Sequence, residues 1–351
     1  MNPQNTLHIV RRYGPVGGME RYVWELTGAL AEAGHPVTVL CERNHGGSQP
    51  GVAVHELGEI AQRPRWISLL RFSRRVAQWL HDHPQPPDTL IHSHERVDVH
   101  HVTTFHGPPF ATIFGRGWWR LVSLRVWMQL YLERRELCAA GVRAVVPNSP
   151  LIRRQLQHYY PQTTARLSDP VPPGVTPGPA RVPRVAPPDG GVIGFVGREW
   201  QRKGLMQAVA IVAELRRRRP RLEFWVIGPE PDEVRGMFAD WDGGYRLPGW
   251  ASDFSVYARL DLLLHPARAE PYGMVIAEAM AAAVPVVVSD RCGIAPDVAA
   301  ESGAVLALEA PQADWVAACE RQLTRRAPPP RFERSWEQVA REYAALYRGL
   351  R

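Results

Sequence analysis

Lysine is almost missing from this sequence: 41 of the 42 basic residues are arginine, and the one lysine is Lys203. Cysteine is also scarce, and the four cysteines show neither metal-ligand spacing nor a paired pattern, which favours a reducing compartment. No uninterrupted apolar run reaches about 18 residues, so no membrane-spanning helix is expected. The N-terminus lacks a basic head followed by an apolar stretch, which argues against a secretory signal and predicts a cytoplasmic protein.

The composition is that of a folded protein, with 45% hydrophobic and 22% charged residues. The positive charge is concentrated in one half. Residues 1–175 hold 19 basic and 13 acidic residues, a net charge of +6 out of the total of +7, together with twelve of the thirteen histidines. A basic surface on the first half predicts an anionic partner there.

A proline-rich stretch divides the chain. Residues 170–191 contain eight prolines, which neither continue a helix nor donate to an inner sheet ladder. We therefore expect a first domain over 1–172, a linker over 173–190 and a second domain over 191–328. Because the length also favours two domains, the linker and the length agree.

Short apolar strands alternate with helical patterns in both halves, which predicts α/β domains with parallel sheets and helices on both faces. Ligands bind such sheets at the carboxyl ends of the strands. The expected strands cover 7–10, 36–41, 89–92, 102–105, 144–146, 192–196, 223–227, 262–264 and 284–288, and the expected helices 19–33, 205–218 and 273–282.

The most informative motif runs from Glu270 to Glu278, between an expected strand and an expected helix. The first amides of that helix, at Gly273, Met274 and Val275, are free donors that suit a phosphate group. The two carboxylates suit the hydroxyls of a sugar or a ribose. The spacing alone leaves a second interpretation equally open. In it, Glu270 is an ordinary charged loop residue and Glu278 a solvated helix residue.

This segment resembles the Glu-x7-Glu motif of retaining glycosyltransferases of family 4, which have the GT-B fold. Other landmarks agree in order along the chain. They are the glycine loop Gly17-Gly18-Met19-Glu20, the histidine motif Thr104-Phe105-His106-Gly107, the pair Asn148-Ser149, the motif Gly197-Arg198 with Lys203-Gly204, and the helical tail Phe332 to Tyr347. The resemblance implies two Rossmann-like domains facing each other across a cleft, with a C-terminal helix over 329–351 crossing back to the first domain.

The resemblance also implies roles for individual residues. Arg198 and Lys203 would grip the donor diphosphate, where two cations stabilise charge on the leaving group, and Arg202 would assist. Glu278 would bind the donor ribose and Glu270 the transferred sugar. His106 would face the sugar and the acceptor, and Gly17 and Gly18 would let backbone amides approach the diphosphate or the acceptor. These side chains also have plainer interpretations: Lys203 as an exposed or helix-capping residue, His106 as a surface or core histidine, and the glycines as a tight turn.

Two further features have competing interpretations. Asp240-Trp241-Asp242 is similar to a metal-binding motif of another glycosyltransferase fold, but it lies in an expected loop, and the resemblance implies no metal. The basic, aromatic segments 63–80 and 115–130 suit peripheral contact with an anionic membrane. Packing of each apolar side against the protein's own sheet is the interpretation that we favour for them.

The sequence therefore predicts a retaining, metal-independent hexosyltransferase. Its donor is a nucleotide-diphosphate sugar, with UDP favoured, and its acceptor is an anionic glycan or glycolipid of the lipopolysaccharide core or another cell-envelope glycan. It would work in the cytoplasm or at the cytoplasmic face of the inner membrane. A nucleotide-sugar epimerase on the same fold and a non-enzymatic polyanion-binding protein are the alternatives, while no nucleic-acid recognition motif is present.

Overall fold

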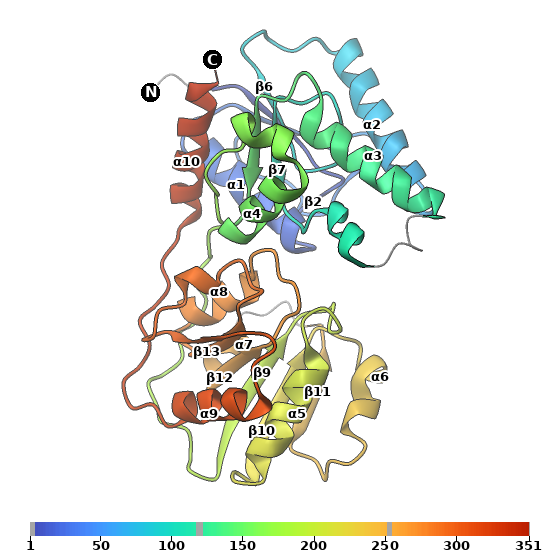
Figure 1. The fold of residues 1–351 in the computed structure, drawn as a ribbon. Coiled ribbons are helices and arrows are strands. Elements are labelled where there is room, and N and C mark those ends of the chain that lie inside the picture. The colour runs from blue at the N-terminus through green and yellow to red at the C-terminus, as the bar shows by residue number, and fades with distance from the viewer. Residues whose placement is uncertain (1–3, 117–121, 251–254, 351) are drawn as a thin grey trace. The chain divides into compact units, whose positions relative to one another are not determined.

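The computed structural model describes residues 4–116, 122–250 and 255–350, and the chain divides into two compact units (Figure 1). The first unit takes Met1–Gly174 together with Arg334–Arg351, and the second takes Val175–Glu333. The C-terminal helix α10 (Trp336–Gly349) thus belongs to the first unit. Within the described residues, no helix has the length and apolar character needed to span a bilayer.

The first unit is built on a six-stranded parallel sheet in the order β5-β3-β1-β6-β7-β8. A two-stranded ribbon, β2 (Arg12–Tyr13) with β4 (Arg43–Asn44), adjoins it. The sheet strands are β1 (Thr6–Ile9), β3 (Val37–Cys41), β5 (Val52–Glu56), β6 (Leu90–Ser93), β7 (Val102–Phe105) and β8 (Ala144–Pro147). The helices are α1 (Gly18–Glu32), α2 (Arg65–Asp82), α3 (Leu124–Cys138) and α4 (Pro150–Tyr159), with 3-10 turns at Phe110–Arg116 and Pro161–Arg166.

Helices cover both faces of this sheet, so β1 is buried along its whole length. Because successive strand residues point to opposite faces, Leu7 and Ile9 pack in one cluster with Phe72 of α2. His8 points to the opposite side. Helices α1 and α10 lie side by side (Figure 1), and α2 lies beside α3.

The second unit has the same strand order along the chain, here β11-β10-β9-β12-β13-β14. The strands are β9 (Gly190–Val196), β10 (Arg221–Ile227), β11 (Tyr245–Gly249), β12 (Leu262–His265), β13 (Val286–Ser289) and β14 (Gly303–Leu306). The helices are α5 (Leu205–Arg216), α6 (Pro231–Val234), α7 (Ser255–Arg259), α8 (Met274–Ala281) and α9 (Gln312–Leu323), with 3-10 turns at Arg235–Phe238 and Ala295–Asp297. One core cluster lies between the sheet and α5 with α9, and the other between the sheet and α7 with α8.

Both sheets therefore show the doubly wound order, in which the direction of winding reverses next to the first strand. Ligand sites in such folds form at the carboxyl ends of the strands on either side of this reversal. In the second unit these strands are β9 and β12, and in the first unit β1 and β6. The predicted α/β architecture with two Rossmann-like domains is confirmed.

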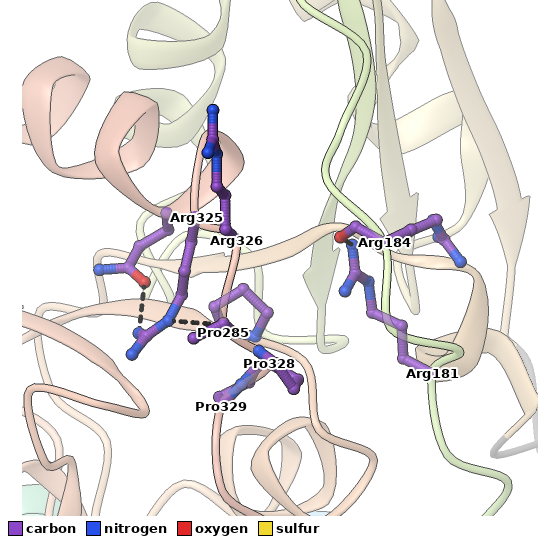
Figure 2. A pocket seen from close by; sticks show the side chains of 9 residues that line it. Arg181, Arg184, Pro285, Arg325, Arg326, Pro328 and Pro329 are labelled. Atoms are coloured by element: carbon purple, nitrogen blue, oxygen red, sulfur yellow. Dashed lines mark hydrogen bonds between the residues drawn. The ribbon is translucent and has the colours of Figure 1, made fainter.

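The proline-rich segment is held on the second unit from Val175 onward. The Arg181 amide donates to the Ala282 carbonyl over 2.8 Å, and the guanidinium groups of Arg181 and Arg184 each lie 2.8 Å from Asp261. Asp261, which is buried, also accepts the Val192 amide. Figure 2 shows the two arginines of this segment across a small pocket from Arg325 and Arg326.

The Asp261 carboxylate should therefore be a major anchor of the second unit. We expect Asp261→Asn to lower the free energy of unfolding by about 3–5 kcal/mol, since two arginines lose a buried counter-charge. Urea unfolding followed by circular dichroism measures the loss. Asp189→Asn, which breaks the exposed pair with Arg221, is the matched control and should change little. Equal effects of the two substitutions would contradict the anchoring role.

Candidate functional site

The residues of the two most specific motifs meet at the carboxyl edge of the second sheet. The loop after β9 carries Arg198, Arg202 and Lys203, and the loop after β12 carries Glu270. The Nζ of Lys203 donates to Oε2 of Glu270 over 2.7 Å, and both side chains are largely buried. The reversal in strand order thus brings a cation and a carboxylate that are 67 residues apart into direct contact.

Glycines make room for the lysine. Gly197 has a φ of +143°, and a Cβ built there would lie 2.3 Å from Cδ of Lys203. Gly204, with a φ of +81°, would bring a Cβ to 2.0 Å from the carbonyl oxygen of Pro266. Both positions require glycine because the backbone is left-handed and the space is filled. The Lys203 side chain therefore runs over bare backbone to reach Glu270.

Glu270 is fixed through its backbone as well as its side chain. Its amide donates to the Arg291 carbonyl, and its carbonyl accepts the Gly293 amide. His265, fully buried at the end of β12, places Nε2 3.5 Å from Oε2 of Glu270, and the Arg202 guanidinium lies 3.6 Å from the same oxygen. Three basic side chains thus surround one carboxylate.

The balance of burial and charge keeps Glu270 ionised. Burial alone would raise the pKa of this carboxyl, but Lys203, His265 and Arg202 together lower it well below its usual range. Burial also lowers the pKa of His265. An ionised carboxylate accepts hydrogen bonds and donates none, so Glu270 is suited to hydroxyl donors.

Arg198 and Arg202 line an open hollow beside this pair. The Arg198 guanidinium carbon lies 4.1 Å from the ring centre of Trp250, a distance typical of a cation–π contact. Arg202 donates to Glu199 over 2.6 Å and to the Ala269 carbonyl. The hollow is lined by Arg198, Glu199, Trp200, Gln201, Arg202 and Glu233.

Helix α8 begins four residues after Glu270, at Met274. Gly273 precedes it with a φ of +112°, and a Cβ there would lie 2.8 Å from Cδ1 of Ile276. The first intrahelical bond joins the Ile276 amide to the Gly273 carbonyl, so Met274 and Val275 occupy the turn whose amides precede the helix ladder. Glu278 is buried further along α8, and its carboxylate accepts the Tyr257 hydroxyl over 2.7 Å.

The remaining predicted residues lie in the first unit. Gly17 and Gly18 form the start of α1, and a Cβ on Gly17 would lie 2.3 Å from Oε2 of Glu20. His106 follows β7 directly, and its Nε2 lies 2.9 Å from Nδ1 of His94. Burial lowers the pKa of His106 to about 3, so its ring is neutral at physiological pH.

Two groups of side chains bear on metal binding. Asp240 and Asp242 are both exposed in the loop before β11. Among the described residues, His8, His92 and His94 bring one ring nitrogen each within 4.8 Å of one another. Five of their six ring nitrogens have hydrogen-bond partners among the described residues, and Nε2 of His8 is the exception.

Sequence reasoning missed several of these neighbours. His265 ends an apolar strand at the sheet edge where ligands bind, which was a usable signal. His8 and His92 interrupt two apolar strands. They can be recognised as cross-strand partners only once the order of the strands in the sheet is known. Trp250 and Tyr257 carry no local signal, because their contacts with Arg198 and Glu278 come from distant parts of the chain.

The charge on Glu270 predicts a pH-dependent stability. A carboxyl whose pKa is lower in the folded than in the unfolded state stabilises the fold above its unfolded pKa of 4.5, and the stabilisation is lost as the pH falls below that value. We expect Glu270→Gln to cost about 3 kcal/mol at pH 7, since Lys203 loses its counter-charge. Urea unfolding at pH 7, 5 and 3.5 gives the difference in unfolding free energy between the wild type and the variant. This difference should become smaller only at the lowest pH. A difference that does not change with pH would contradict the ionised state.

Comparison with known proteins finds relatives of both halves of the chain. Residues 16–178 match the family described as Glycosyltransferase Family 4, and residues 190–325 match Glycosyl transferases group 1. A "Probable transglycosylase" of Burkholderia thailandensis is 28% identical over 84% of this chain and 80% of its own length. A phosphatidyl-myo-inositol mannosyltransferase of Mycolicibacterium smegmatis is 28% identical over 78% of this chain and 72% of its own length.

Solved structures show the same fold. WaaG, a glycosyltransferase involved in lipopolysaccharide biosynthesis, superimposes with a TM-score of 0.77 at 20% identity, covering 97% of this chain and 95% of its own. HepE of Anabaena, in complex with UDP-glucose, superimposes with a TM-score of 0.69 at 16% identity, covering 99% of this chain and 100% of its own. The chain is therefore a glycosyltransferase of the GT-B fold, built from a family 4 domain and a group 1 domain.

Proposed function

We propose that this glycosyltransferase transfers a hexose, with retention of the anomeric configuration, from a UDP-sugar to a glycan or glycolipid of the cell envelope. The observation that carries the proposal is the buried pair of Lys203 and Glu270 at the carboxyl edge of the second sheet. An ammonium group has three N–H donors. Glu270 accepts one of them, which leaves Lys203 able to donate to phosphate oxygens at the same time.

Lys203 and Arg198 supply the positive charge that the leaving diphosphate needs. As the bond between the sugar C1 and the diphosphate oxygen breaks, negative charge grows on that oxygen, and fixed cations stabilise it. This chemistry requires no divalent ion, and we propose that transfer is metal-independent. The acceptor hydroxyl attacks C1 from the face that the diphosphate leaves, and its proton passes to a departing phosphate oxygen.

Carboxylates hold the rest of the donor. Glu270 stays ionised and next to Lys203, so its oxygens accept bonds from hydroxyls of the transferred sugar close to the diphosphate. Glu278, held by Tyr257, binds the ribose hydroxyls.

Gly273 lets the chain turn so that the amides of Met274 and Val275 approach a phosphate. Arg202 orients Glu270. In the first unit, Gly17 and Gly18 let backbone amides approach the diphosphate or the acceptor. His106 faces the sugar and the acceptor.

Net charge and two relatives support the proposed acceptor. The first half carries +6 of the net charge, which suits a phosphorylated core oligosaccharide or an anionic glycolipid. WaaG is involved in lipopolysaccharide biosynthesis, and the mycobacterial relative is named for a lipid substrate. We propose lipopolysaccharide core assembly, at the cytoplasmic face of the inner membrane, as the setting.

Helix α3 favours contact with an anionic membrane. Leu124, Trp127 and Tyr131 are 69%, 53% and 53% exposed, and their spacing places them on one side of the helix. Arg125 and Arg134 are exposed on the same helix. The segment 63–80 differs, because Phe72 and Val76 of α2 pack on the sheet. Trp118 and Trp119 of the segment 115–130 lie outside the described residues.

Lys203 provides the test of the donor site. UDP and UDP-glucose should raise the melting temperature of the protein in EDTA, because a ligand that binds only the folded state stabilises it. Lys203→Ala should weaken UDP binding by about 10- to 100-fold, the cost of losing a charged contact. The rate at which UDP forms during transfer to core oligosaccharide should fall by a similar factor. Arg221→Ala, at the opposite edge of the same sheet, is the control and should match the wild type.

Three results would contradict the proposal. They are binding that needs a divalent ion, a Lys203→Ala enzyme within twofold of the wild type, or an epimer of the donor sugar formed without acceptor.

Membrane contact has its own test. The protein should sediment with vesicles of phosphatidylglycerol and phosphatidylcholine, and binding should fall as salt rises. The double substitution Trp127→Ser with Tyr131→Ser should reduce the bound fraction at least fivefold. Met206→Ser, which removes an exposed apolar side chain from the second unit, is the control. Unchanged sedimentation of the α3 variant would contradict the proposed surface.

A further inference from the structure

Four histidines gather at the carboxyl edge of the first sheet. His8 lies in β1 and His92 in β6, where the two are cross-strand partners. His94 follows β6, and His106 follows β7. His8, His92 and His94 are buried, whereas His106 is partly exposed.

Three of these rings form a hydrogen-bonded chain. Nδ1 of His8 lies 3.2 Å from Nε2 of His94, and Nδ1 of His94 lies 2.9 Å from Nε2 of His106. His92 belongs to a different network, because its nitrogens bond to the hydroxyls of Tyr347 and Thr104 over 2.6 and 2.8 Å. The chain therefore runs from the core at His8 to the accessible surface at His106.

Neutral rings restrict this chain to two proton arrangements. Burial lowers the pKa of His8 and of His106 to about 3 each, and it lowers that of His94 as well, with help from the neighbouring histidines. A neutral imidazole carries one N–H, and each of the two bonds needs one donor. Either all three rings carry the proton on Nδ1, or all three carry it on Nε2.

The surroundings of His8, at the buried end of the histidine chain, favour one of the two proton arrangements. Nε2 of His8 is buried and has no hydrogen-bond partner among the residues that the structure describes. With protons on Nε2, an N–H group would be orphaned in the core. With protons on Nδ1, the orphan is a lone pair. Among buried backbone groups, orphaned N–H donors are rarer than under-satisfied acceptors. By the same reasoning, we favour the Nδ1 arrangement.

We propose that His8 and His94 are positioning residues that fix His106 as its Nδ1–H tautomer, so that His106 offers a sugar substrate a hydrogen-bond donor and not a base. Nδ1 of His106 has no protein partner among the described residues. Its Nε2 accepts the hydrogen bond that Nδ1–H of His94 donates. The contact between His106 and a sugar rests on the proposed function, whereas the proton arrangement does not.

Aromatic side chains of α1 and α10 pack around the accessible end of the histidine chain. The ring of Tyr22 from α1 packs edge-on against His106 at 4.8 Å, and its hydroxyl bonds to Tyr343 of α10. Burial raises the pKa of Tyr22, Tyr343 and Tyr347, so these phenols stay neutral. Among the described residues, these tyrosines and the histidines of β1 and β6 do not change charge between pH 6 and 8. Glu95, which follows His94, does ionise in this range, because burial raises its pKa to about 7.

Nuclear magnetic resonance tests the tautomers directly. Long-range proton–nitrogen spectra of the full chain, labelled with ¹⁵N in its histidine rings and treated with EDTA, should show Nδ1–H for His8, His94 and His106. A proton on Nε2 of His106, an imidazolium, or spectra that differ before and after the EDTA treatment would each overturn the proposal. This measurement uses the wild-type protein and needs no substrate.

Two substitutions of His94 test the consequence for turnover. Asn places an amide N–H near the position of Nδ1, so His94→Asn keeps the donor to His106, whereas His94→Leu removes it. We expect His94→Leu to lower kcat/KM at least tenfold and to add an ionisation near the ordinary histidine pKa of about 6.5. His94→Asn should recover most of the loss and lack that ionisation. Equal losses with unchanged pH profiles would overturn the positioning role.

The outcomes also separate this proposal from the proposed function. If the spectra show Nδ1–H tautomers while UDP fails to bind the wild type, the proposed function fails and the histidine chain stands. If UDP binds and the spectra show Nε2–H on His106, the histidine chain fails and the donor site stands.

Discussion

The contact between Lys203 and Glu270 is the constraint on which the second unit's site depends. Two loops that are distant in sequence meet there because the sheet reverses its winding between β9 and β12. The contact also explains the glycine at position 197, which leaves bare backbone under the lysine side chain. A compact ammonium on a thin methylene stem fits this passage, whereas a guanidinium is broader and prefers a bidentate partner. That difference gives a physical reason for a lone lysine in a sequence that otherwise uses arginine.

The core of the first unit contains a network of polar side chains. Tyr22, Thr104, Tyr343 and Tyr347 link the sheet to α1 and α10 through buried hydrogen bonds, and His92 joins this network. Buried polar groups need such partners, since each unpaired group costs free energy. The C-terminal helix is therefore part of the support for the strand ends that carry His94 and His106. The histidine chain lies beside this network and shares its face of the sheet.

Much of the fold was predictable because apolar strands and helical periodicity alternate so regularly. The predicted strand 192–196 lies within β9, and the predicted helix 205–218 covers α5. Strands β5, β11 and β14 were missed, since edge strands carry a weak apolar pattern and are partly exposed. In the site, the pairing of Lys203 with Glu270 and the role of His265 required the topology, because no spacing rule joins loops 67 residues apart. The roles of Arg198, Glu278 and the glycines stay predictions.

One thermodynamic cycle tests the central claim that Lys203 binds the donor diphosphate. Isothermal titration would compare UDP with uridine, each against the wild type and Lys203→Ala. If the lysine contacts the diphosphate, the substitution weakens UDP binding by about 10-fold or more, the cost of a lost charged hydrogen bond, and leaves uridine binding unchanged. Equal weakening of both ligands would mean that the substitution disturbs the site as a whole, and it would contradict the account.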